Sequence, residues 1–313
     1  MKFFISGGNG YLGSALAYKL HGDGHDVTVS VRNEVYRNLF PKEVTVLKYD
    51  FHNFEDLQTR IQDFDGLIHA AGMSAFACEL SPLDANLING EMTGKLMEIS
   101  ANAHVPKFIH LSTIHVYPQP WIGSINENSN TLASNAYSAS KLLGENLVHD
   151  QNSKTRTIGI SLRLSNVFGS PRIDHPNFWS SYANEVCLQA FLKNKIEIKS
   201  DPSIRRDFLP METFLSRINS IITDRDLGTD GKVLNIVSGL NFSLFEFACL
   251  VQIASEKILG RTPKIIHNKS ISDEISSNFQ FRSLTKFEEL TPKTIGDEIE
   301  RTFKHLAGRH KGF

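Results

Sequence analysis

Residues 6–13 read SGGNGYLG, with glycines at three-residue spacing. The apolar run KFFIS at 2–6 predicts a strand before this stretch, and YLGSALAYKLHG at 11–22 predicts a helix after it. Glycine permits a tight turn and a close approach of the backbone to a pyrophosphate, to which the start of a helix offers unpaired N–H groups. This context favours a dinucleotide-binding turn over an ordinary one. The residues expected to bind the cofactor there are Gly7, Asn9, Gly10, Tyr11, Leu12 and Gly13.

The remainder of the first half alternates β-rich runs with helical ones. Helical patterns cover 56–63, 87–103 and 136–151. Such alternation favours a parallel sheet with helices on both faces. We therefore expect an α/β fold built on a Rossmann-like, doubly wound parallel sheet. Its further strands are expected at DVTVSV (26–31), VTVLKYD (44–50), GLIHAAG (66–72), KFIHLST (107–113) and TIGISLRLSNVFG (157–169).

The composition of the sequence changes after Gly169, where SPRIDHPNFW is rich in proline and polar residues. We expect residues 1–169 to form an NAD(P)-binding domain, and residues 170–313 to form mainly a smaller, mixed substrate-binding lobe. The run KVLNIVSG indicates one more strand of the main sheet, so a part at about 232–250 is expected to return to it.

Composition narrows the choice of partner. The chain has 313 residues, of which 41% are hydrophobic, and a formal net charge of -1, which argues against a nucleic-acid binder. The apolar run before the glycine turn is too short for a signal peptide or a membrane span, so we expect a cytoplasmic protein that does not contact a membrane. Cys78, Cys187 and Cys249 lack the short spacing of a metal site, and no metal is expected. The expected partner is a small molecule.

The end of the second strand bears on the choice of cofactor. An acidic residue there would bind both ribose hydroxyls of NAD, but the sequence has Val31 and Arg32. A guanidinium suits a ribose 2′-phosphate, so NADP(H) is favoured and NAD(H) stays possible; Arg32 could also be a solvated surface residue. Asp50, at the end of the third strand, could accept a bond from the adenine amino group or cap the next helix. Phe51 beside it is also assigned to the cofactor site.

The stretch YSASK places Tyr137 and Lys141 four positions apart on a predicted helix, so both side chains share one face. A nearby ammonium favours the phenolate and brings the tyrosine pKa down from about 10, which suits proton transfer. A solvent-facing pair is the plain alternative. The strand that ends in HLSTIHVYP at 110–118 could bring a hydroxyl to the same substrate oxygen.

Taken together, these motifs resemble an extended short-chain dehydrogenase/reductase of the NAD-dependent epimerase/dehydratase family, most of whose members act on nucleotide sugars. The resemblance covers nearly the whole chain. The motifs that carry it, in the family's order, are SGGNGYLG, HAAG, LSTIHVYP, YSASK, LRLSNVFG, RRDFLP and VLNIVSG.

The resemblance implies roles for residues of the first half. Thr113 matches the catalytic Ser/Thr, Tyr137 the acid/base and Lys141 the ribose-binding lysine. Asn89 matches an asparagine that helps to hold the active-site backbone. His69, which taken in isolation is better interpreted as a core histidine, begins the strand end that passes the cofactor. The cofactor residues at that strand end are Ala70, Ala71 and Gly72.

In the second half, the resemblance implies that Asn166 lies beside the substrate phosphates and that Arg206 binds the nucleotide pyrophosphate. A fork of donors fits phosphate oxygens. Arg205 could share this role or face solvent. Lys269 lies in the region of a further basic residue of the family. A nucleotide sugar is therefore the implied substrate.

The residues after Thr113 bear on the reaction. Sugar 4,6-dehydratases of the family have Asp-Glu there, because elimination of water needs a further acid and base, but this sequence has Ile114 and His115. We interpret His115 as structural, with a role as an unusual base left open. Since Arg32 favours an exchangeable NADPH, reduction of a keto group on a nucleotide sugar is the first hypothesis.

Several alternatives stay open. The same residues would serve a nucleotide-sugar C4 epimerase that retains NAD, and the fold could also serve a non-catalytic NADP-binding sensor or the reduction of a non-sugar carbonyl compound. A homodimer through helices at 82–101 and 135–150 is possible, because family members often pair through a helix bundle.

Overall fold

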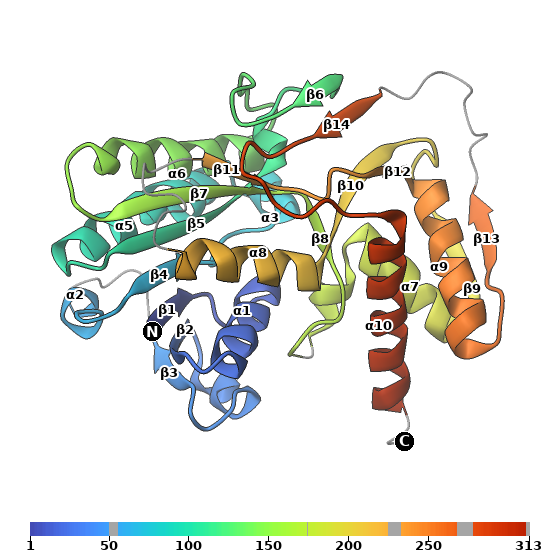
Figure 1. The fold of residues 1–313 in the computed structure, drawn as a ribbon, viewed down its shortest axis with the longest axis horizontal. Coiled ribbons are helices and arrows are strands. Elements are labelled where there is room, and N and C mark those ends of the chain that lie inside the picture. Colours follow the sequence, from blue (N-terminus) through green and yellow to red (C-terminus); the bar gives the residue numbers. More distant parts are fainter. Residues whose placement is uncertain (50–55, 174, 225–232, 268–277, 311–313) are drawn as a thin grey trace. The chain divides into compact units, whose positions relative to one another are not determined.

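The main sheet has the strand order β11-β7-β5-β4-β1-β2-β3, and the strands from β7 to β3 pair with their neighbours in parallel (Figure 1). A computed structural model describes residues 1–49, 56–173, 175–224, 233–267 and 278–310. β1 lies inside the sheet and the chain winds outward from it to both edges, which confirms the predicted doubly wound α/β fold. Its strands are β1 (Lys2–Ser6), β2 (Asp26–Val31), β3 (Thr45–Lys48), β4 (Gly66–His69), β5 (Lys107–Thr113), β7 (Ile158–Leu164) and β11 (Val233–Ile236).

Helices cover the sheet on both faces, with α5 and α6 on one face and α1 on the other (Figure 1). Alternate strand residues explain this, because Phe4, Leu67 and Phe108 point to the same face and pack with side chains of α5 and α6. Full burial of each contributes roughly 2–3 kcal/mol. The helical segments here are α1 (Tyr11–Gly22), η1 (Glu34–Leu39), α2 (Leu57–Arg60), α3 (Ala75–Leu80), α4 (Pro82–Ala85), the π-helical η2 (Asn86–Glu91), α5 (Met92–Asn102), η3 (Ile114–Val116), α6 (Ala136–Asn152) and α8 (Met211–Thr223).

The stretch 157–169 was predicted as one strand, and this is wrong. The chain changes partners at Ser165, whose N–H donates to Ile236 O at 3.2 Å. β7 ends at Leu164 in the main sheet, while β8 (Asn166–Phe168) pairs with β10 (Arg205–Pro210) in another sheet. The run is apolar on both sides of Ser165, so hydrophobicity alone could not show the break.

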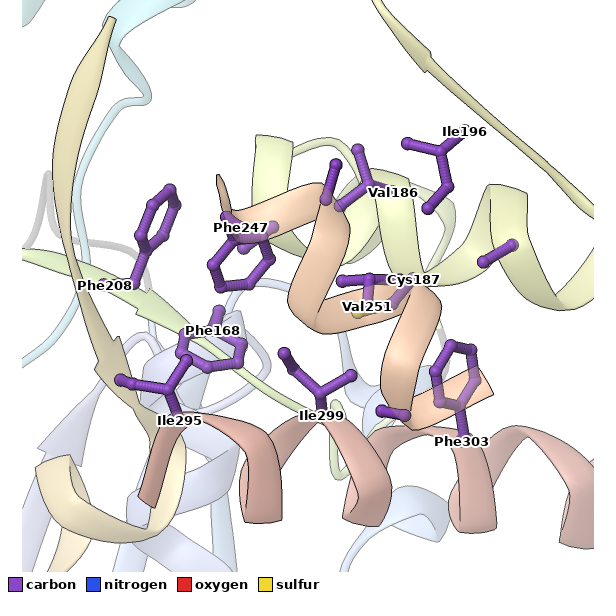
Figure 2. Close-up of a cluster of buried hydrophobic side chains, with 14 of the residues drawn as sticks. Phe168, Val186, Cys187, Ile196, Phe208, Phe247, Val251, Ile295, Ile299 and Phe303 are labelled. Atoms are coloured by element: carbon purple, nitrogen blue, oxygen red, sulfur yellow. The ribbon is translucent and has the colours of Figure 1, made fainter. Parts of the chain in front are cut away.

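The second part of the chain has its own core, shown in Figure 2, with aromatic rings from β8, β10 and α9 at its centre. The rings of Phe208 and Phe247 lie 4.2 Å apart between centroids. β10 pairs parallel with β8 and antiparallel with β12, so this sheet is mixed. The remaining elements are β6 (Gly123–Ile125), η4 (Pro176–Trp179), α7 (Tyr182–Lys193), β9 (Lys195–Ile198), β12 (Asn241–Ser243), α9 (Leu244–Leu259), β13 (Lys264–His267), β14 (Phe279–Phe281) and α10 (Pro292–His310).

Two compact units result, and each takes several segments of the chain. The first comprises Met1–Gln119, Ser129–Leu164 and Arg217–Leu234; the second comprises Pro120–Asn128, Ser165–Ser216 and Asn235–Phe313. The main sheet takes back β11 at one edge, while β12 and α9, which follow directly, belong to the second unit. None of the helices in the described ranges is long and apolar enough to span a membrane.

Candidate active site

The glycine turn lies against the end of β4. Gly7 has a left-handed backbone (φ +70°), and a Cβ on it would lie 2.7 Å from Ala71 N. A Cβ on Gly13 would lie 2.2 Å from Gly7 O. Only glycine fits at either position, because real Cβ atoms do not approach backbone so closely. The turn and the strand end at Ala70–Ala71 therefore meet, as a cofactor site of this type requires.

The other predicted cofactor residues divide into three groups. Asn9, Tyr11 and Leu12 are half-buried in the turn and the first turn of α1, whose N-cap is Gly10. Arg32 follows β2 directly and is exposed. Asp50 and Phe51 lie outside the described residues.

Thr113 and Tyr137 meet above the end of β5. Helix α6 begins with a capping box in which Asn135 Oδ1 accepts from Ser138 N–H at 2.8 Å, and this fixes the first turn that carries Tyr137. Burial raises the pKa of Tyr137, while a hydrogen bond with the Thr113 side chain lowers it. The half-buried phenol of Tyr137 is therefore protonated, and it lies against Thr113, the residue that the sequence motifs predicted beside it.

Lys141 is buried one helical turn beyond Tyr137, and its Nζ donates to Leu111 O at 2.9 Å. Burial lowers the pKa of Lys141 to about 8, opposed by Cys78 and Glu145. The ammonium therefore loses its proton only slightly above neutral pH. Such a shift at a residue that faces the end of the sheet is typical of a functional site.

Asn89 connects this pair to the strand end beside the glycine turn. Its Oδ1 accepts from Met73 N–H at 2.8 Å, and its Nδ2 donates to Ser140 Oγ at 3.1 Å. A Cβ on Gly72 would lie 2.9 Å from Asn89 Oδ1 and 3.3 Å from Lys141 Nζ. Hence the end of β4, α6 and η2 come together around Lys141.

Sequence analysis missed a buried polar group beneath this pair. Glu145, one helical turn beyond Lys141, accepts from Arg163 NH2 at 2.7 Å and from the Ser112 hydroxyl. The Tyr137–Lys141 spacing continues to Glu145 on the same helix face, and this was the available signal. Arg163 comes from β7 and no local pattern could pair it with α6.

His115 also lies near Tyr137. Its N–H donates to Thr113 Oγ1 at 3.2 Å, its ring centroid is 6.5 Å from that of Tyr137, and its Nδ1 is 3.4 Å from Gln119 Nε2. The imidazole is half-buried. It is therefore in the vicinity of the proton-transfer pair and is anchored there.

A row of buried polar residues crosses the main sheet below the site. Ser6, His69, His110 and Ser161 occupy paired register positions on β1, β4, β5 and β7. Ser6 Oγ is 2.6 Å from His69 Nδ1, and His110 Nδ1 is 3.3 Å from Ser161 Oγ. Burial, assisted by the charge of Lys141, lowers the pKa of His69 to about 3 and that of His110 well below its usual value. Both rings are neutral in the folded protein.

These histidines should make the protein sensitive to acid. The unfolded chain takes up a proton on His69 below about pH 6.5, whereas the folded chain does so only near pH 3, so the free energy of unfolding should fall as the pH drops through this window. The slope is about 1.4 kcal/mol per pH unit for each such group. We expect His69→Asn, which keeps a partner for Ser6, to reduce the slope of the unfolding free energy against pH by the equivalent of about one proton. Urea unfolding at a series of pH values measures this slope.

His104→Asn is the matched control, because His104 is exposed and has a left-handed backbone (φ +59°) that asparagine adopts readily. Equal slopes for wild type and His69→Asn between about pH 7 and about pH 5 would contradict the prediction.

In the second unit, Asn166 and Arg206 line one pocket of about 210 Å³. Asn166 Nδ2 donates to Asp207 O at 2.9 Å, and the Arg206 guanidinium lies 5.9 Å from the centroid of the Trp121 ring. Arg206 is half-buried, and this burial lowers the pKa of its guanidinium. The pocket also contains Val167, Ser181, Tyr182, Ala183, Ser200, Ile204, Phe208 and Leu244.

The two neighbours of Arg206 are structural. Arg205 bonds Asn241 and pairs with Glu246 at 3.0 Å, so its guanidinium is engaged on β12 and α9. Asp207, which sequence analysis did not single out, is fully buried and accepts from the N–H groups of Ser238 and Gly239 at 2.8 Å each. Lys269 lies outside the described residues.

The parallel sheet, its glycine turn and the tyrosine–lysine pair define an extended short-chain dehydrogenase/reductase. The family model for the NAD dependent epimerase/dehydratase family matches residues 3–236. The chain belongs to this family.

Among characterised relatives, a probable low-salt glycan biosynthesis reductase (Agl14) of Haloferax volcanii is 30% identical over 54% of this chain and 55% of its own length. A UDP-glucose 4-epimerase of Corynebacterium glutamicum is 27% identical over 54% of this chain and 52% of its own length. The chain thus spans about half the length of these relatives. The structure of a UDP-glucuronic acid 4-epimerase from Bacillus cereus, in complex with UDP-glucuronic acid and NAD, has the same fold (TM-score 0.79, 20% identity, 98% of this chain and 99% of that one).

Proposed function

We propose that the protein reduces a keto group on a nucleotide-activated sugar with NADPH. The observation that carries the proposal is the arrangement around the end of β5, where Tyr137 bonds Thr113 and Lys141 lies beside Gly72. Gly7 packs against Ala71, the residue before Gly72, so the nucleotide turn and the proton-transfer pair share one end of the sheet.

In this proposal each residue of the site has a separate role. Bound NADPH would supply the hydride. Tyr137 is kept protonated by burial and donates its proton to the keto oxygen, while Thr113 donates a hydrogen bond to the same oxygen. Lys141 holds the cofactor ribose and stabilises the phenolate that remains.

The substrate class rests on the pocket in the second unit. Arg206 offers a partly desolvated fork of donors and Asn166 lies in the same pocket, a combination suited to a diphosphate. Relatives named for UDP-glucose and UDP-glucuronic acid support a nucleotide sugar.

An epimerase that retains NAD is the second candidate. It is favoured by the relatives named as UDP-glucose 4-epimerases and by related structures that contain NAD. The reductase is favoured by exposed Arg32 after β2, in place of an acidic residue, and by the relative named as a probable reductase.

The two candidates differ in how the cofactor is held. We expect the purified protein to release its nucleotide readily and to bind NADPH about 10-fold more tightly than NADH, a preference that Arg32→Ala should abolish, because one charge-assisted contact is worth about 1.5–3 kcal/mol. Fluorescence titration measures both affinities. Arg37→Ala is the control, because Arg37 is an exposed arginine of the same unit that is already bonded to Val46 O. Tightly retained NAD would make the epimerase the better proposal.

We also propose a homodimer in which a second copy covers α3, α4 and η2. Phe76 and Leu80 on α3, Leu83 on α4 and Leu87 on η2 are exposed large hydrophobic residues. A group of exposed apolar residues of this kind is typical of an interface. Sedimentation of a monomer at micromolar concentration would contradict this.

A further inference from the structure

Three consecutive residues at the end of β5 are each bonded to α6. Leu111 O accepts from Lys141 Nζ at 2.9 Å, the Ser112 hydroxyl donates to Glu145 Oε1, and Thr113 bonds Tyr137. Residues 137, 141 and 145 are one helical turn apart and share a face of α6. The strand end that carries the proposed catalytic hydroxyl is therefore fixed to this helix by successive side chains.

Glu145 is in turn fixed by Arg163 on β7. Arg163 Nε donates to both carboxylate oxygens at 3.1 Å, and NH2 donates to Oε2 at 2.7 Å. Arg163 NH1 donates to Tyr117 OH at 2.9 Å, and its guanidinium lies 4.8 Å from the centroid of that ring. Glu145 is 3% exposed and Arg163 is 5% exposed. Desolvation offsets most of the Coulombic gain of such a pair, so stability alone does not account for it.

We propose that the buried Glu145–Arg163 pair is a positioning device for the proton-transfer residues. Through Ser112 it holds the end of β5 at a fixed distance from α6, so that Thr113 meets Tyr137. Through the charge of Glu145 it keeps Lys141 an ammonium. This inference rests on the proposed function of Tyr137 and Lys141.

The charge part of this role follows from the groups around Lys141. Among the described residues, those that interact electrostatically with it are Cys78 on α3, His69 on β4, His110 on β5 and Glu145 on α6. Burial keeps both histidines neutral and raises the pKa of the Cys78 thiol, so that it too is neutral near pH 7. Tyr137, on the same helix face, is protonated. Glu145 is therefore the anion of this set that opposes the desolvation of Lys141.

The test is the titration of Lys141 by NMR in protein that carries ¹³Cε-labelled lysine, with the signal assigned by Lys141→Arg. Glu145→Gln alone would leave Arg163 buried without a counter-ion and could fail to fold. The double variant Glu145→Gln/Arg163→Gln removes both charges and is expected to fold. In it the pKa of Lys141 should fall, because Glu145 acts on Lys141 directly, whereas Arg163, whose charge is removed with it, is not among the groups that shift this pKa.

Two further variants separate the charge from the hydrogen bond. Ser112→Ala leaves both charges in place and is expected to lower kcat about 10-fold with the pKa of Lys141 unchanged. Glu212→Gln/Arg172→Gln removes an exposed pair of the same residue types, and we expect neither quantity to change.

A folded double variant in which Lys141 titrates as in wild type would overturn the inference, as would full activity in Ser112→Ala. The titration needs no turnover. If the pKa of Lys141 shifts in the double variant but the wild-type protein has no reductase activity, the positioning role is supported and the proposed function is rejected.

Discussion

Tyr137→Phe is expected to lower kcat for reduction of a 4-keto nucleotide sugar by about 10²–10⁴-fold, the usual contribution of a positioned general acid. The substitution keeps the ring and its half-buried packing but removes the proton donor and the partner of Thr113. Binding of NADPH should be unchanged, because Lys141 keeps its bond to Leu111 O. Single-turnover oxidation of NADPH measures the chemical step directly.

The control for this variant is Tyr18→Phe, which removes a tyrosine hydroxyl that bonds Leu39 O on the surface of the same unit. A rate for Tyr137→Phe within about 2-fold of wild type would exclude the phenol from the chemistry. Retained biological activity in that variant, with loss in Arg32→Ala, would instead favour the sensor.

Gly13→Ala is expected to weaken cofactor binding by about 10²-fold. The new Cβ would lie 2.2 Å from Gly7 O, and neither backbone segment has a flexible side chain that could move aside. The turn must therefore shift by about 1 Å, and loss of a hydrogen bond to the charged pyrophosphate costs about 1.5–3 kcal/mol, which is about 10²-fold in affinity at its upper end. Isothermal titration with NADPH and with NADH would measure the loss for both cofactors.

Gly22→Ala is the matched control, since Gly22 is the last residue of the same helix and a Cβ on it meets no atom within 4 Å. It should bind cofactor as wild type does, and be more stable by up to about 1 kcal/mol. Unchanged binding in Gly13→Ala would mean that the pyrophosphate does not use this turn.

Local patterns in the sequence were sufficient for the fold because each element carries its own signal. The helix predicted at 11–22 and the strand predicted at 107–113 have these bounds in the structure. The change of sheet at Ser165 was missed because it depends on Ile236 and β10, which are far along the chain. Period and hydrophobicity do not report which strand is the partner.

In the proposed site, too, some residues have a local sequence signal, whereas others have partners that only the fold brings to them. The spacing of Tyr137 and Lys141 is local, and the structure places both with Thr113 as the sequence indicated. Arg163 and Asp207 are held by residues 18 and 31 positions away, and only the fold brings those partners to them. The sequence shows that Arg205 and Arg206 are both positively charged, but not which of them has a partner. The structure shows that Arg205 pairs with Glu246, whereas Arg206 lines the pocket.

The polar row of Ser6, His69, His110 and Ser161 also bears on how the sheet assembles. A slip of one residue between two of these strands would turn the imidazoles to the opposite face and separate them from their serine partners. Apolar neighbours such as Ile68 and Ile109 would tolerate such a slip far better, because dispersion contacts have little direction. The row therefore fixes the register of four strands. A mispaired sheet lacks these hydrogen bonds and is less stable, which favours separation of the strands and correct pairing.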